Sequence, residues 1–507
     1  MSRQRIQRRA ARAVTLSLGV LLAGCAAVPT TISDKMPAIP GFTPKQDKTI
    51  VERLRAEDAA DKVRPAPATP PTAPPDPLAD LDNRRIYSYI VPSPPLSAYL
   101  NGLLQRVRQA SPRPDLPAHV YALYDNTLVA DTTPAGNIFL SLGWLKQVES
   151  EDELLAVLAH EYGHIALHHY DFDEIANNQK RLKLLSTGFF VLRQVVNTGN
   201  ASATLTKGDT DRLKTQENLI QVMDAVIHPG WKRAQELDAD KYALDTLMQM
   251  KRAPKGLTDF FEHVDAQDTT MKLAAEKAAK ETIKTPDPAA AAAAAAAKFS
   301  WGDLLDPLLV QLKSATHPSA AERSLSIDTY RDLFYPTASQ PVRIRPDMGG
   351  LAKVRTENKQ LFANYEKARE AEIKLKNGDA KEALKLARLA ASGPTAKHAY
   401  PLAQQFQAQM TLRQTKDADA TFNLITRADD PTWKEYDFYL EHSQADQKAK
   451  DGMMEAGFQK FHEAPTLQAA RIAYYKKSGN LKLANQLVIT CTARTPDYRD
   501  GCEKSLK

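Results

Sequence analysis

The feature that most constrains the fold is the run His160-Glu161-Tyr162-Gly163-His164. Histidines four positions apart lie on one face of an α-helix, so both imidazoles can bind the same metal ion. Apolar residues flank the run at 154–159 and 165–167, and a polar side chain on such a buried helix is costly without a partner. The alternative is a surface helix that carries two histidines by chance. The pattern favours one zinc ion per chain, with Glu161 beside it to accept a proton from a bound water.

A catalytic zinc ion usually has three protein ligands and a water. The third ligand is expected within residues 234–240, where Glu236 and Asp240 share one helical face. One of these carboxylates can bind zinc while the other accepts a hydrogen bond from the far nitrogen of a ligand histidine. Asp238, on another face, is expected to be solvated.

These segments resemble a family of membrane-associated zinc metallopeptidases, the gluzincins that include HtpX, the CAAX prenyl proteases and the Oma-type and BepA-type proteases. The resemblance also rests on Thr316-His317-Pro318 with Arg323, and on residues 134–143, which resemble the family's glycine-bearing strand. It implies an α+β fold, mainly helical, with a small sheet. It also implies that Glu236 is the third ligand and Asp240 the hydrogen-bond partner of a ligand histidine.

The same resemblance implies a zinc metalloendopeptidase, a hydrolase acting on the peptide bonds of protein substrates. His317 or Arg323 would donate a hydrogen bond to the oxyanion. His317 could instead cap the zinc or be an ordinary loop histidine, and Arg323 could be a salt-bridge partner. A strand containing Asn137, Ile138 and Phe139 could pair with an extended substrate. The neighbouring residues 168 and 169, both histidines, are expected to extend the motif helix in structural roles.

Residues 1–24 have the pattern of a bacterial export signal, with five arginines before an apolar stretch too short to span a bilayer. Leu22-Ala23-Gly24-Cys25 resembles a lipobox, which predicts lipidation of Cys25; the alternative is an ordinary signal with a stray cysteine. Ala26 follows in place of aspartate, which favours the outer membrane. We therefore expect a periplasmic protein held to the membrane by lipid.

The charge of the chain gives no support for nucleic-acid binding. The formal net charge is +6, and removal of the five signal arginines leaves +1 (6 minus 5). Cys491 and Cys502 remain once Cys25 is lipidated, and a disulfide between them is plausible in an oxidising periplasm. The alternative is two free thiols.

Four regions are expected along the chain. The signal peptide at 1–24 precedes a lipid-anchored, proline-rich linker at 25–84, with ordered structure starting near Ile86. A zinc metalloprotease domain covers 85–345, with a helix at 96–109 and strands at 119–124 and 137–141. Within it, residues 182–196 suggest a core helix or a lid, and the polyalanine run 289–297 suggests a surface insertion without chemistry.

The fourth region, 350–507, resembles helix–turn–helix units of the tetratricopeptide type. Similar alanine patterns surround Gly378 and Gly479, which are 101 positions apart, close to three repeats of 34, and a degenerate copy lies near 412–422. An irregular helical bundle is the alternative. A repeat array would present a surface for a peptide or partner, such as outer-membrane assembly machinery.

Two functions from different classes follow. The first is an endopeptidase for misfolded or misassembled envelope proteins, that is, periplasmic quality control. The second is a chaperone or adaptor of outer-membrane protein assembly that acts through the repeats and has a latent protease site. A purely structural zinc domain is the weakest reading, because it leaves Glu161 without a role.

Overall fold

The computed structural model describes residues 48–61, 76–169, 233–283, 318–336, 347–494 and 499–506. The expectations for the signal peptide, Cys25, the proline-rich tether, residues 182–196, the polyalanine run and His317 fall outside these ranges. No helix in the described part combines the length and apolar character that a bilayer crossing requires. The fold is mainly helical with a small sheet, as expected.

The sheet has three strands in the order β1-β3-β2. Strands β1 (His119–Leu123) and β3 (Asn137–Ser141) were predicted, and they pair in parallel with residue 119 opposite residue 137. Strand β2 (Ala130–Thr132) pairs antiparallel with β3. It was not predicted, because three residues are too few to show an alternating pattern.

The substrate-strand prediction for Asn137, Ile138 and Phe139 is wrong. Strand β3 lies between β1 and β2, so its backbone is hydrogen-bonded on both sides and every residue in it is buried. A peptide can add to a sheet only at an outer strand, because an inner strand has no backbone groups left to pair.

Gly136 marks the turn into β3. Its φ of +84° lies in the left-handed region, and an added Cβ would come within 2.2 Å of the carbonyl oxygen of Pro117. Only glycine meets both conditions. The glycine noted in the sequence before this strand therefore has a backbone role.

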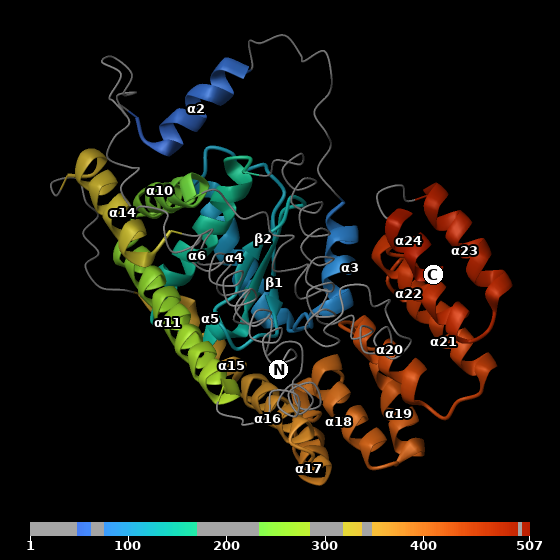
Figure 1. Cartoon of the computed structure of the whole chain (residues 1–507). Coiled ribbons are helices and arrows are strands. Elements are labelled where there is room, and N and C mark those ends of the chain that lie inside the picture. Colours follow the sequence, from blue (N-terminus) through green and yellow to red (C-terminus); the bar gives the residue numbers. More distant parts are fainter. Residues whose placement is uncertain are drawn as a thin grey trace, which may run out of the picture. The chain divides into compact units, whose positions relative to one another are not determined.

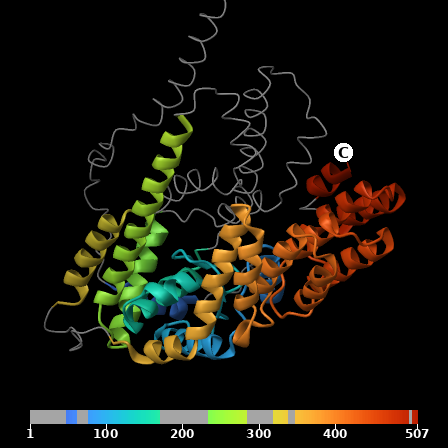
Figure 2. The same cartoon turned by 90° about the horizontal axis from the view of Figure 1, so that it is seen from below.

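The motif lies on helix α6 (Glu151–Ala166), which begins at the N-cap Ser150. All sixteen residues of this helix are buried, as the apolar flanks predicted. Helix α6 packs against α4 (Pro94–Ala110), α10 (Arg233–Gln249) and α11 (Lys255–Ile283) (Figure 1). Helix α14 (Ala320–Phe334) lies beside α11 in both views (Figures 1 and 2).

Ordered structure begins well before Ile86, so that expectation is wrong. Helix α2 (Ile50–Asp61) lies within the segment 25–84 that was expected to be a linker, and helix α3 (Pro77–Tyr87) begins in it. One face of α2 is buried, and the backbone N–H of Val51 donates to Asp245 on α10. The proline-rich composition between the two helices concealed short segments that gain their stability from tertiary contacts.

Helix α5 (Leu142–Gln147) directly follows β3, and helix α15 (Gly349–Glu357) precedes a series of C-terminal helices. These lie in consecutive pairs, drawn in orange to red in Figure 1. They are α16 (Lys359–Lys376), α17 (Ala380–Ala390), α18 (Ala399–Thr411), α19 (Thr415–Ile425), α20 (Trp433–His442), α21 (Gln447–Lys460), α22 (Pro465–Lys477), α23 (Leu481–Arg494) and α24 (Arg499–Leu506).

The glycines of the proposed repeats lie in the turns between paired helices. Gly378 separates α16 from α17 and Gly479 separates α22 from α23, and both have left-handed φ values of +80° and +86°. The helix–turn–helix arrangement therefore agrees with the expectation. Its classification as a tetratricopeptide repeat stays a prediction.

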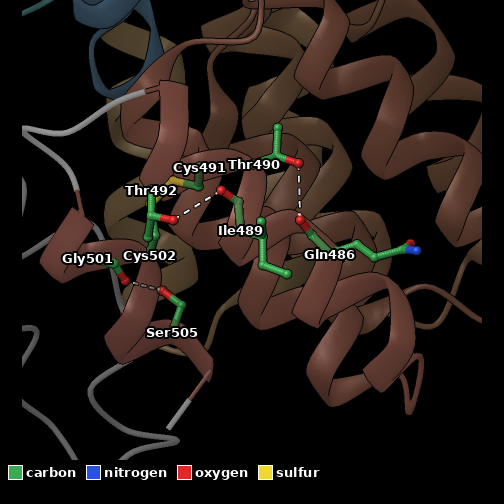
Figure 3. The surroundings of a disulfide bond; sticks show 8 residues. All are labelled: Gln486, Ile489, Thr490, Cys491, Thr492, Gly501, Cys502 and Ser505. Atoms are coloured by element: carbon green, nitrogen blue, oxygen red, sulfur yellow. Dashed lines mark hydrogen bonds between the residues drawn. A yellow bond between two sulfur atoms is a disulfide. The ribbon is translucent and has the colours of Figure 1, made fainter.

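A disulfide links Cys491 of α23 to Cys502 of α24, with a Cα–Cα distance of 6.2 Å (Figure 3). Both cysteines are buried. Near it, the hydroxyl of Thr492 donates to the carbonyl of Ile489 at 3.0 Å. The disulfide connects the last helix, α24, to the helical pair that precedes it.

Candidate metal centre

Three potential ligand side chains meet where α6 packs on α10. The Nε2 atoms of His160 and His164 are 3.2 Å apart. Glu236 places one carboxylate oxygen 3.6 Å from His160 Nε2 and the other 3.5 Å from His164 Nε2. All three side chains are buried. Within the described residues this is the one group of three such side chains able to hold a metal ion.

These separations suit zinc. Ligands about 2.1 Å from a tetrahedral ion lie about 3.4 Å from one another. The two Nε2 atoms are 3.2 Å apart, and the two oxygens of Glu236 lie 3.6 and 3.5 Å from them, one oxygen near each, so the three side chains are close enough to share one ion. Two neutral imidazoles and a carboxylate form a donor set that catalytic zinc prefers. The residues present therefore fit the ion that the sequence implied.

Gly163 allows the two helices to approach. A Cβ at this position would lie 3.0 Å from Tyr242 Cδ1 and 3.4 Å from the Cα of Ala239. The glycine within the motif thus brings α10, and with it Glu236, close to the histidines. Local helix geometry sets the spacing of the histidines, and this contact sets their distance to the carboxylate.

Asp240 accepts a hydrogen bond from the far nitrogen of His160, with 2.9 Å between Oδ1 and Nδ1. Arg323 on α14 donates to both carboxylate oxygens of Asp240, at 2.8 and 2.6 Å. Burial acts to raise the pKa of Asp240, but Arg323 and the hydrogen bond from His160 outweigh it, so the pKa is lowered. Asp240 is therefore ionised and holds the ring of His160 in place.

Arg323 is buried, and its guanidinium lies 4.8 Å and 4.4 Å from the ring centroids of Phe260 and Phe261 on α11. Of the alternatives for this residue, the salt-bridge role is the one with a visible partner, Asp240.

Glu161 is buried next to the candidate ligands. Burial raises the pKa of this carboxyl group well above its usual value. Asp131 on β2 and Glu236 raise it further, whereas Arg323 lowers it. A carboxylate withdrawn from water in this way is a stronger base than an exposed one.

The expectation that residues 168 and 169 extend α6 is wrong. The helix ends at Ala166, and His168 has a φ of +52°. The chain turns back, so that Nδ1 of His169 lies 3.0 Å from Nδ1 of His164. Burial lowers the pKa of His169 to about 4.

Asp238 is partly exposed and pairs with Lys241 at 3.2 Å.

The sequence interpretation missed Asp131 and placed His169 along an extended helix instead of against His164. No glycine or proline marks the end of α6, although histidine is among the residues that enter the left-handed region more readily. Asp131 was missed together with its short strand.

Residues 94–331 match the model of Peptidase family M48. Over these residues the chain is similar to a metallopeptidase domain of this family. Its enzyme class, a zinc-dependent hydrolase of peptide bonds, follows from that match and confirms the prediction. The matched segment contains His160, Glu161, His164, Glu236 and Arg323. A comparison with curated proteins gives no match to the chain.

Proposed function

We propose that this metalloprotease is an endopeptidase that degrades misfolded or misassembled envelope proteins in the bacterial periplasm. The observation that carries the catalytic part is the convergence of His160, His164 and Glu236, whose ligand atoms lie within 4.8 Å of one another beside the buried Glu161. We assign the three as zinc ligands and Glu161 as the catalytic base.

The mechanism follows from the positions of these side chains. Zinc bound there would lower the pKa of a bound water and polarise the peptide carbonyl. Glu161 accepts a proton from the attacking water and then returns it to the nitrogen of the leaving amine, as the C–O bond forms and the C–N bond breaks. Asp240, held by Arg323, keeps the His160 ring oriented. His317 is retained as a candidate donor to the oxyanion.

A substrate peptide that adds to the sheet would do so at an outer strand. Of the two outer strands, β2 contacts α6 and contains Asp131, whose charge acts on Glu161. We therefore replace β3 by β2 as the strand beside which the scissile bond lies.

The proposed compartment rests on the lipobox-like segment ending at Cys25 and on the basic, then apolar, residues before it. The disulfide between Cys491 and Cys502 supports an oxidising location. The consecutive helix pairs from α16 onward support recruitment of substrates or of outer-membrane assembly machinery.

Replacement of Glu161 by glutamine tests the catalytic assignment. The variant should retain zinc, about one ion per chain by mass spectrometry, and lose about 10²–10⁴-fold in the cleavage rate of an unfolded outer-membrane protein. Glu370→Gln, an exposed change on α16, is the matched control and should cleave normally. Unchanged cleavage by the Glu161 variant would remove Glu161 from the mechanism.

The cellular role is tested with the same pair of variants. In cells, the Glu161 variant should let misassembled outer-membrane proteins accumulate, whereas the Glu370 variant should not. If the Glu161 variant instead restores assembly as well as the wild type, the chaperone or adaptor function is favoured over proteolysis.

A further inference from the structure

We propose that His169 is a positioning residue that orients the imidazole of His164 for metal binding. The inference rests on the assignment of His164 as a zinc ligand. It concerns the far side of that ring, where no role was assigned from the sequence.

The backbone at the end of α6 brings His169 back toward His164. The N–H of residue 168 donates to the carbonyl of Ile165 at 3.2 Å, and the N–H of residue 169 donates to the carbonyl of His164 at 3.1 Å. This pair of bonds, with a left-handed residue at position 168, is the Schellman motif that closes many helices. Such a motif places the second residue after the cap against the third residue from the helix end, here His169 against His164.

The side chains complete the contact. In Schellman motifs the two residues frequently make an apolar contact, whereas here two imidazoles meet with Nδ1 atoms 3.0 Å apart. The other ring nitrogen of His164 is 3.2 Å from His160 Nε2 and 3.5 Å from Glu236. His169 therefore lies on the side of the ring opposite the ligand atoms and is not itself a ligand.

The protonation states follow from this arrangement. When Nε2 of His164 binds a metal, its proton is on Nδ1, which then donates to His169. Nδ1 of His169 must accept, so that ring carries its proton on Nε2. The hydrogen bond selects the tautomer of His164 and limits rotation of its ring, as outer partners of metal-bound histidines do.

The cap is also tied to the helix that supplies the third ligand. The side-chain amide of Gln235 donates to the carbonyl of His169 at 3.3 Å, and Gln235 immediately precedes Glu236. The two motif histidines thus have different outer partners: ionised Asp240 for His160, and a neutral imidazole for His164.

Variants at position 169 test the proposal in the full chain. His169→Ala removes the acceptor and should raise the zinc dissociation constant about 10-fold or more, measured by competition with a chelator. Asn carries its side-chain oxygen close to where Nδ1 lies, so His169→Asn should restore most of the affinity. His168→Asn is the control. It tolerates the left-handed backbone, changes an exposed side chain and should bind zinc normally.

A second readout separates orientation of the ring from general stability. The visible absorption of the Co²⁺-substituted protein should differ between His169→Ala and the wild type and be recovered in His169→Asn. Thermal unfolding of the metal-free variants controls for folding. Equal zinc affinity and equal Co²⁺ spectra for His169→Ala and the wild type would overturn the proposal, as would equal losses in His169→Ala and His169→Asn. A wild-type chain that binds no zinc would contradict the metal centre itself.

Discussion

Helix α10 carries three buried acidic residues whose environments differ, and their positions assign them different roles. Glu236 faces the two motif histidines, and Asp240 forms a salt bridge with Arg323. Asp245 accepts hydrogen bonds from Val51 N–H at 3.1 Å and from the hydroxyls of Tyr330 and Tyr335 at 2.9 and 2.8 Å. Because its three hydrogen-bond donors are neutral, Asp245 has far less compensation for its negative charge than Asp240.

Asp245 should make stability depend on pH. Burial raises its pKa to about 6 from the usual 3.8. The carboxyl group of Asp245 therefore binds its proton more tightly in the folded protein than in the unfolded chain. The resulting stabilisation of the folded state is complete below about pH 4 and is lost as the pH rises through 6. The metal-free wild type should gain on the order of 2–3 kcal/mol relative to Asp245→Asn between pH 7.5 and 4.

Urea denaturation of both proteins at each pH measures this gain. Asp265→Asn, an exposed change on α11, should track the wild type at every pH. A difference between wild type and Asp245→Asn that stays constant with pH would show that this carboxyl group does not titrate in the expected range.

At the scale of elements, the site depends on how closely α6 and α10 approach. The contact passes through Gly163, where a methyl group would press on Tyr242 and Ala239. Gly102 on helix α4 has no such close contact, because no neighbouring atom lies within 4 Å of the position of an added Cβ. The two positions separate the effect of backbone freedom from that of packing.

We expect Gly163→Ala and Gly102→Ala to behave differently. The Gly102 variant should be more stable by about 0.5–1 kcal/mol, because alanine favours helix. The Gly163 variant should lose that gain and bind zinc more weakly, because α10 is displaced together with Glu236. Melting temperature and zinc affinity measure the two effects. Equal stabilisation by both changes, with unchanged zinc affinity, would contradict the close-contact argument.

At the scale of the molecule, the protease region and the helical pairs share one core. Residues Thr49–Lys507 form a compact unit. Among the described residues, one cluster of buried apolar side chains has members from Ile50 in the N-terminal part to Cys502 in the last helix. The expected boundary near residue 350 therefore does not separate two cores. Tyr124 after β1 stacks on Tyr400 of α18 with ring centroids 3.7 Å apart, and their hydroxyls are 2.6 Å apart.

The contact between Tyr124 and Tyr400, here called the tyrosine junction, should determine whether the protease region and the C-terminal helices unfold together. Tyr400 also contacts Tyr89 and Tyr365 and donates to Glu372 at 2.8 Å. Tyr400→Ala should cost about 3–5 kcal/mol and split the calorimetric transition in two, because it removes ring contacts from both sides.

Tyr474→Ala, on α22 and away from this junction, is the control for loss of a tyrosine. It should lower the transition without splitting it. A single transition in Tyr400→Ala, with the same melting temperature as the wild type, would show that the shared core does not depend on these rings.

Much of the site could be predicted because its parts obey local rules. A separation of four residues on a helix places His160 beside His164 and Glu236 beside Asp240, wherever those helices lie. The apolar flanks indicated that α6 is buried, and alternation indicated β1 and β3. The resemblance to known metallopeptidases then ranked Glu236 above Asp240 as the ligand.

Sequence alone determined the chemistry of this protein: the residue types of a zinc peptidase site and the helices that present them. Tertiary structure decided the rest. It placed β3 inside the sheet and buried α2 against α10. These outcomes depend on contacts between segments far apart in the chain, where no fixed period relates one position to another. His164 and Glu236 are 72 positions apart (236 minus 164), so the packing of α6 on α10, which includes the close contact at Gly163, sets their distance.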